Sequence, residues 1–235
     1  MEPAGLAVGG VALAGLFNNA VDCFEYVQLG KNFGKDFQTS LLKLDDARLR
    51  LSRWGKTVGL SGEIADLQSL ESTQLSAEAV PKAERLLGQI LDLFADAERV
   101  SGKFKSHAAI GDPSLLVLDV QADMDSLHQT LHEKMRSLSI IRQNKTPLRQ
   151  KVKWALYERK NFDRLIADVI ELVNMLAETF PGFQQAQQEL CKLEVSDIET
   201  EGLPVLESIV ATQDQDLHTA ILEALKKVPV SYLTY

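Results

Sequence analysis

The sequence predicts an all-α protein: a single helical bundle domain of about eight or nine helices, with at most a short two-stranded β element. Apolar residues recur at helical spacing along most of the 235 residues, strand-like segments are few, and no Gly/Ser-rich or Pro-rich linker divides the chain. The strand candidates are the apolar run Leu115–Leu118, which follows a turn, and the alternating segment Leu193–Val195. We expect one domain over residues 1–227 and leave the tail 228–235 unassigned.

The first expected helices are marked by their ends or by their apolar stripes. Pro3 is tolerated in a first helical turn and Gly30 is a typical C-terminal stop, which predicts a helix over residues 3–29. Phenylalanines and leucines at helical spacing predict a second helix over 33–58. A polar region with room for one short helix follows. A leucine-rich stripe then predicts a third helix over 77–105.

The remaining helices follow from turn signals and periodicity. Gly111–Ser114 is a turn, and apolar residues at helical spacing predict the next helix over 124–143. Thr146-Pro147 is typical of an N-cap followed by proline at the first helical position, which predicts a helix that ends near Arg159. The last four expected helices cover residues 162–179, 183–192, 204–211 and 214–227.

The composition excludes several function classes. The net charge is −8, so the chain lacks the positive charge that drives nucleic-acid binding, and we expect no nucleic-acid partner. A chain of this length can bury enough surface to fold without disulfides, metals or another cofactor, so we expect Cys23 and Cys191 to be separate buried thiols. The only charge before Asp22 is Glu2, so the basic start of a secretory signal is missing and we expect a cytoplasmic protein.

No catalytic constellation is found in the sequence, and we expect no enzyme activity. His128 and His132 are four residues apart on a predicted helix, which places both rings on one face, as in a metal site. Glu133 lies outside this pair, whereas a zinc protease requires a glutamate inside it, and the sequence suggests no third ligand. The pattern favours two exposed histidines on an amphipathic helix and no metal.

The N-terminal segment is the most informative feature of the sequence. From Pro3 to Val21 there are 19 residues without a charge, close to the ~20 residues that a membrane-spanning helix requires. Its glycines weaken a helix in water by about 0.5–1 kcal/mol each, yet small residues four apart allow close helix packing in lipid. The segment is either membrane-directed or a buried first helix. The two interpretations agree if the helix is partly buried at rest and inserted after activation.

A second feature is a basic stretch between Lys134 and Arg164. It contains ten basic and two acidic residues, so it carries +8 in a chain that is otherwise acidic. Charges interleaved with apolar residues are typical of a solvated helix face. The alternative is attraction to anionic lipid, worth about 1 kcal/mol for each Lys or Arg near the surface.

The segment Ala14–Gly30, AGLFNNAVDCFEYVQLG, closely resembles the HeLo domain, the N-terminal domain of the fungal HET-S/HET-s heterokaryon-incompatibility proteins. The likeness continues through Phe33–Asp36, Ala47–Gly55 and Lys153–Tyr157. It covers most of residues 1–227, with a more divergent middle. The resemblance implies an all-helical domain with a short two-stranded element and a membrane-directed N-terminal helix over residues 1–30.

The resemblance also implies a role in prion-controlled programmed cell death. In toxic members an amyloid-forming segment is templated, the domain is disturbed, and the N-terminal helix is expelled into a membrane, which an oligomer permeabilises. The implied partners are membrane lipid after activation, a second copy of the chain, and an amyloid-forming segment or partner prion protein. The implied location is cytoplasmic at rest and the plasma membrane after activation. The alternative is a non-toxic, prion-type regulatory module that self-associates.

This hypothesis gives individual residues expected roles. Asp22 and Glu25 mark the boundary that must stay wet or paired, because a carboxylate at bilayer depth is costly. Asn32, just past the helix-ending Gly30, is expected to set how readily the helix is released. The residues expected to insert are Leu6, Val8, Val11, Leu13, Leu16 and Phe17, and those expected to pack between helices in the membrane are Gly5, Gly9, Gly10 and Ala14.

The family's amyloid segment follows the helical domain. No Asn/Gly-rich paired repeats follow Lys227 in this sequence. We therefore expect this chain either to be part of a longer protein or to receive its signal in a different way.

Overall fold

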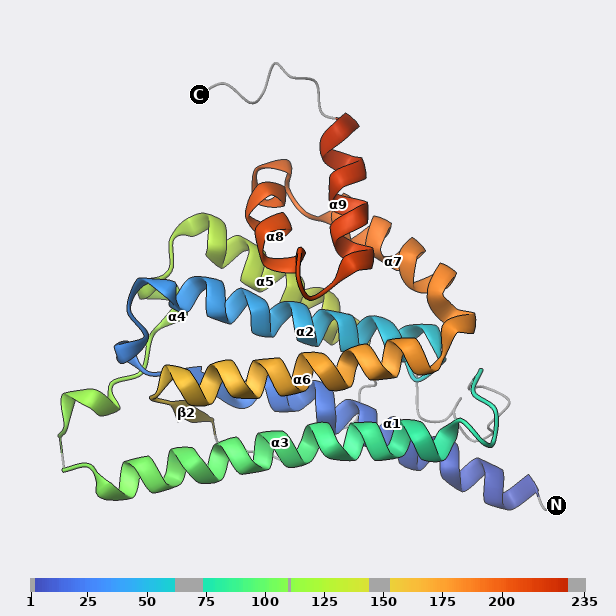
Figure 1. Ribbon diagram of the computed structural model, residues 1–235, viewed down its shortest axis with the longest axis horizontal. Helices are drawn as coiled ribbons and strands as arrows, with labels where there is room; N and C mark the ends of the chain where they lie inside the picture. The colour runs from blue at the N-terminus through green and yellow to red at the C-terminus, as the bar shows by residue number, and fades with distance from the viewer. Residues whose placement is uncertain (1–2, 62–73, 110, 144–152, 228–235) are drawn as a thin grey trace.

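The computed structural model describes residues 3–61, 74–109, 111–143 and 153–227; the side chains of residues 3–10, 32 and 35 are not described. Within these ranges, nine α-helices and one two-stranded sheet confirm the predicted all-α class (Figure 1). The α-helices are α1 (Pro3–Tyr26), α2 (Phe37–Thr57), α3 (Val80–His107), α4 (Val120–Asp123), α5 (Ser126–Ile141), α6 (Arg159–Thr179), α7 (Gln184–Asp197), α8 (Leu203–Val210) and α9 (Gln215–Lys227). The other elements are strands β1 (Val27–Leu29) and β2 (Trp154–Leu156) and 3-10 turns η1 (Lys31–Asp36), η4 (Pro113–Leu115), η5 (Pro181–Phe183) and η6 (Thr200–Gly202).

The two strands lie where the sequence did not predict them. β1 directly follows α1 and pairs in parallel with β2, with Val27 opposite Trp154 and Leu29 opposite Leu156. The first helix therefore ends three residues earlier than predicted. The helix predicted to end near Arg159 is wrong from Trp154 to Leu156, which form β2, while residues 144–152 lie outside the described ranges. Three-residue strands are too short to give a recognisable period of two.

Both predicted strands are wrong. Leu193–Val195 lies inside α7. The run Leu115–Leu118 forms only one isolated antiparallel bridge, between Val117 and Gly30. The Leu118 amide nevertheless donates to the Leu29 carbonyl at 2.8 Å, so this run lies along the free edge of β1.

The second helix begins later than predicted because of a glycine. Gly34 has a φ of 63°, inside η1. This left-handed conformation is easy for glycine and interrupts a right-handed helix. The predicted start at residue 33 is therefore corrected to Phe37, while the helices predicted from 77, 124, 162, 183, 204 and 214 correspond to α3, α5, α6, α7, α8 and α9 within a few residues.

The apolar side chains form two clusters that share α2. The first joins α1, α2, α3 and α6, and the second joins α2 to α5, α7, α8 and α9. Figure 1 shows α1, α3 and α6 on one side of α2, with α8 and α9 on the other. Sixteen of the 21 residues of α2 are buried, including Asp45, Asp46, Arg48 and Arg53. Buried charges are costly unless they are paired, so α2 requires ionic partners from its neighbours.

Candidate functional site: how the N-terminal helix is held

The described part of α1 has one buried face and one exposed face. Leu13, Ala14 and Phe17 are at most 1% exposed and pack against α2 and α3. Val11 is 39% exposed, and no atom outside the helix lies near the position of a side chain at Gly15. At rest, this part of α1 is therefore a first helix of the bundle, buried along one side.

Several of the residues expected to act in the membrane lie outside the described side chains, namely Gly5, Leu6, Val8, Gly9 and Gly10. Leu16 is half-buried and packs on the core. Among the residues that the structure describes, no helix combines the length and the apolarity needed to cross a membrane. The membrane roles of these residues stay predictions.

Phe17 is the main apolar anchor of α1. Its ring lies 6.4 Å from that of Trp54, between ring centres, and both side chains are fully buried. The ring rests directly on Gly55 of α2, so closely that a side-chain carbon at Gly55 would overlap it. One turn from the end of α1, Phe24 meets Phe94 of α3 edge to face at 4.8 Å. These aromatic contacts fix the position of α1 against both neighbours.

The C-terminal end of α1 is held by ion pairs. Arg136 of α5 binds both oxygens of the Glu25 carboxylate, donating from Nε to Oε1 at 2.7 Å and from Nη2 to Oε2 at 2.8 Å. Arg48 of α2 donates to the same Oε1. Burial raises the pKa of Glu25, but the hydrogen bond from Arg136 and the charge of Arg48 outweigh it and hold the pKa below its ordinary value. Glu25 therefore joins α1, α2 and α5 as a carboxylate.

A second carboxylate, Asp22, is joined to the end of α5. Gln143 donates from Nε2 to Asp22 Oδ1 at 2.6 Å, and the same amide lies 3.4 Å from the Asn18 carbonyl oxygen. The structure thus places two of the three predicted release residues, Asp22 and Glu25, at one end of α1. The third, Asn32, has its backbone in η1, and its side chain lies outside the described residues.

A buried ionic cluster, which the sequence analysis missed, joins the C-terminal helices to α2. Arg53 binds Glu194 of α7 through Nε and Nη2, with the shorter contact at 2.6 Å, and Asp214 through Nη1 at 2.8 Å. Arg142, at the end of α5, donates to the other oxygen of Glu194. All four side chains are at most 8% exposed. The sequence feature that could have predicted this cluster is the presence of charged residues beside core residues of α2, since Arg53 directly precedes the buried Trp54.

The ionic cluster and the end of α1 meet at two consecutive residues. Arg142 reaches Glu194 in the cluster, and Gln143 reaches Asp22 in α1. The Arg142 carbonyl oxygen also accepts a 2.6 Å hydrogen bond from Ser61, which follows α2. A polar path thus runs from the start of α9 through Arg53 to α1.

Asp46 borders this cluster and has a strongly raised pKa. It is 1% exposed and accepts from Gln213 through one oxygen, while Oδ1 has no partner among the described residues. Burial and then the charge of Asp214 raise the pKa of Asp46 from 3.8 to about 8, although Gln213, Arg53 and Arg50 act in the opposite direction. Because the folded-state pKa lies above the unfolded one, the contribution of Asp46 to stability is complete below about pH 4 and is lost as the pH rises towards 8.

We therefore predict that Asp46→Asn flattens this pH dependence. The amide has the shape of the protonated acid and keeps an acceptor for Gln213. The unfolding midpoint of the unmodified chain should decrease as the pH is raised from about 6 to about 8, and the midpoint of the variant should decrease less. Measuring both chains in the same buffers checks this, because the Asp45–His132 pair is common to them. Equal falls would contradict the prediction.

The histidines lie apart in separate pairs. His132 Nδ1 is 2.7 Å from Asp45 Oδ2, and His128 Nδ1 is 2.9 Å from Asp125 Oδ1. Within the described ranges, no group of three potential metal ligands occurs. The side chains of His132 and His128 are only 17% and 22% exposed, so the expectation of two exposed histidines is wrong for both. Cys23 and Cys191 are separate buried thiols, as predicted.

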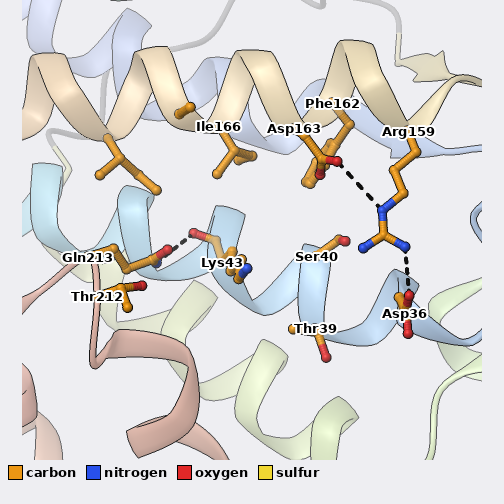
Figure 2. Close-up of a pocket in the computed structure, with 12 residues that line it drawn as sticks. Asp36, Thr39, Ser40, Lys43, Arg159, Phe162, Asp163, Ile166, Thr212 and Gln213 are labelled. Atoms are coloured by element: carbon orange, nitrogen blue, oxygen red, sulfur yellow. Dashed lines mark hydrogen bonds and ion pairs between the residues drawn. The ribbon is translucent and has the colours of Figure 1, made fainter.

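Part of the basic stretch forms ion pairs with described residues. Arg159 donates to Asp36 at 2.6 Å and lies 3.6 Å from Asp163, at one end of a groove of about 470 Å³ between α2 and α6. Figure 2 shows this guanidinium between the two carboxylates, and Gln213 bound to the Lys43 carbonyl farther along the groove. Arg136 and Arg142 are paired as described above, and for them the predicted solvated face is corrected to inter-helix ion pairs. Lys160 and Arg164 are largely exposed, as on a solvated face, and residues 144–152 lie outside the described ranges.

Fold and site together define a helical bundle whose N-terminal helix is fixed by buried aromatic rings and by polar contacts of Glu25 and Asp22. The chain belongs to the HeLo family, described as "Prion-inhibition and propagation", which matches residues 5–206. This confirms the resemblance seen in the sequence.

Relatives from a fungus agree. The chain is 34% identical to "Heterokaryon incompatibility protein s" of Podospora anserina and 33% identical to "Heterokaryon incompatibility protein S" of the same species, in each case over 97% of this chain and 76% of the relative. The solved structure of the HET-s N-terminal domain matches with a TM-score of 0.79 and 31% identity, over 91% of this chain and 97% of that one. A mutant of that domain matches with the same score. These names refer to incompatibility and not to a catalysed reaction.

Proposed function

We propose that the chain is a cell-death execution domain of heterokaryon incompatibility. At rest, in the cytoplasm, the bundle holds α1. An amyloid-forming segment or partner prion protein disturbs the bundle, α1 is released, and an oligomer of the protein permeabilises the plasma membrane. The protein acts through lipid and self-association, without catalysis.

The observation that carries this proposal is the contrast between α1 and its attachment. Residues 3–21 have no charge, yet the helix ends in two carboxylates, Asp22 and Glu25, which bind α5 and α2. Apolar burial is restored in lipid, so leaving the bundle costs that helix little. The polar contacts are made only in the bundle. They are therefore the part of the attachment that a trigger has to break.

The polar path from α9 to α1 supports a trigger at the C-terminal helices. Asp214 accepts from the Leu217 amide at 3.2 Å, so it is both the N-cap of α9 and a partner of Arg53. Unfolding α9 removes this partner from a cluster that Arg142 shares. The adjacent Gln143 then loses a fixed support for its contact with Asp22.

Dye release from liposomes tests the proposal, with Glu25→Lys as a substitute for the unknown trigger. Lysine at this position faces Arg48 and Arg136 with a like charge, so the end of α1 should detach. We expect leakage from Glu25→Lys, none from the unmodified chain, and none from Glu25→Lys lacking residues 1–21. Glu98→Lys, at an exposed position of α3, is the matched control and should not leak.

Two outcomes would count against the proposal: no leakage from the Glu25→Lys chain, or leakage that persists without residues 1–21. Self-association without leakage, and without toxicity in a fungal host, would support the alternative of a non-toxic, prion-type regulatory module. The two Podospora relatives do not favour either choice, because their identities to this chain are almost equal.

A further inference from the structure

A second surface, away from the inner face of α1, has the composition of a membrane-contact site. The last turns of α3, the segment around η4 and the start of α6 enclose a groove of about 410 Å³. Val100, Phe104 and Ala108 provide its apolar wall, and Lys103 lies beside them. Val100 is 40% exposed, and Leu116, just after η4, is 54% exposed. We call this region the α3-end surface.

Aromatic rings give the α3-end surface a rigid base. Phe104 stacks on Tyr157, with ring centres 5.1 Å apart and planes 16° from parallel. The Lys105 ammonium lies 6.0 Å above the centre of the Tyr157 ring. Aromatic rings combined with lysines are typical of the boundary between lipid and water.

The charges of this surface are unequal. Lys103 and Lys105 are exposed, and neither forms an ion pair with a described residue. Of the nearby acids, Glu158 lies 3.1 Å from Lys160, whereas Asp112 keeps its negative charge because its partner, the Ser114 amide at 2.8 Å, is neutral. Three lysines, Lys103, Lys105 and Lys160, therefore face two carboxylates. In a chain with a net charge of −8, this is a place where positive charge is left for an external anion.

We propose that the α3-end surface docks the folded protein on an anionic lipid bilayer before α1 is released. The inference rests on the proposed function and adds the step that precedes it. Lysines close to an anionic membrane contribute about 1 kcal/mol each, and exposed apolar side chains enter the interface beside them. α1 and α3 run in the same direction (Figure 1), and Phe24 near the end of α1 contacts Phe94 of α3. Docking at the end of α3 therefore brings the C-terminal end of α1, with the ionic contacts that hold it, towards the bilayer, whereas the uncharged start of α1 lies at the other end of α3.

Vesicle co-sedimentation of the full resting chain tests the docking step. The vesicles are phosphatidylcholine alone, or phosphatidylcholine mixed with phosphatidylserine. We expect binding only to the mixed vesicles, weakened roughly tenfold or more by K103E/K105E. The matched control is K82E/R85E, which reverses two exposed charges at the start of the same helix and should weaken binding much less.

Equal loss in the two double variants would overturn the proposal, because it would report net charge only. Equal binding to both kinds of vesicle, or binding to neither, would also overturn it. So would a K103E/K105E variant that loses binding to a protein partner while its vesicle binding is unchanged. Leakage by the Glu25→Lys chain separates the two proposals. Leakage without vesicle binding by the resting chain would disprove only the docking proposal. Vesicle binding without leakage would disprove only the permeabilisation proposal.

Discussion

Phe17→Ala should lower the free energy of unfolding by about 3–5 kcal/mol. The ring is fully buried between Trp54 and Gly55, and its removal leaves a cavity between α1 and α2 that the flanking helices cannot close. Because the loss falls on the contact that holds α1, amide exchange in the first turns of α1 should speed up more than exchange in α9. Denaturant unfolding combined with hydrogen exchange measures both effects.

The same contact can be tested from α2. Gly55→Ala adds a carbon where the Phe17 ring lies, and the ring must move, at a cost of about 1–3 kcal/mol. Gly88→Ala is the control, since it lies in another helix with open space at its side-chain position and should be neutral or stabilising. If the two alanine variants had the same stability, the close packing of Phe17 on Gly55 would be ruled out as the anchor of α1.

The anchor also shows what periodicity can and cannot predict. Phe17 was singled out in the sequence as a membrane-facing residue, and at rest it is a core residue. One helical pattern describes both environments, because lipid and protein interior are both apolar. Helix positions were predicted well for α3, α5 and α6, which have long amphipathic stripes, and for α8 and α9. The helix predicted for α7 ended at residue 192, five residues too early, because Leu193–Val195 was interpreted as a strand. β1 and β2 were placed wrongly because their pairing joins residues more than 120 positions apart.

The ionic contacts of α1 lay beyond sequence reasoning for a similar reason. Asp22 and Glu25 were identified from their place next to an uncharged segment. Their partners Arg136 and Gln143 are more than 100 residues away and lie in or beside a stretch that reads as a charged surface. Composition shows that charges are present, but only the fold determines which of them are buried together.

Arg53→Met should be as destabilising as the loss of Phe17, at about 3–5 kcal/mol. Methionine fills much of the same volume, so the loss comes chiefly from Glu194 and Asp214, which stay buried with fewer cationic partners. Arg164→Met is the control: Arg164 is largely exposed and faces Asp168 at 3.7 Å, a surface pair worth less than about 1 kcal/mol. Denaturant unfolding of both variants measures the difference.

Amide exchange in the Arg53→Met variant tests the polar path to α1. Without Arg53, Glu194 keeps Arg142, but Asp214 keeps only the longer, 4.0 Å contact with Arg50 as a described cationic partner on α2, so α9 should exchange faster. If Arg142 and Gln143 transmit this change, exchange near Asp22 should also rise, although no atom of Arg53 is bound to α1. A matched variant, Gln143→Leu, breaks only the last contact and should loosen α1 while α9 stays protected. Faster exchange in α9 with α1 unchanged would show that the two ends of the bundle open independently, and the trigger would then have to act on Glu25 or Asp22 directly.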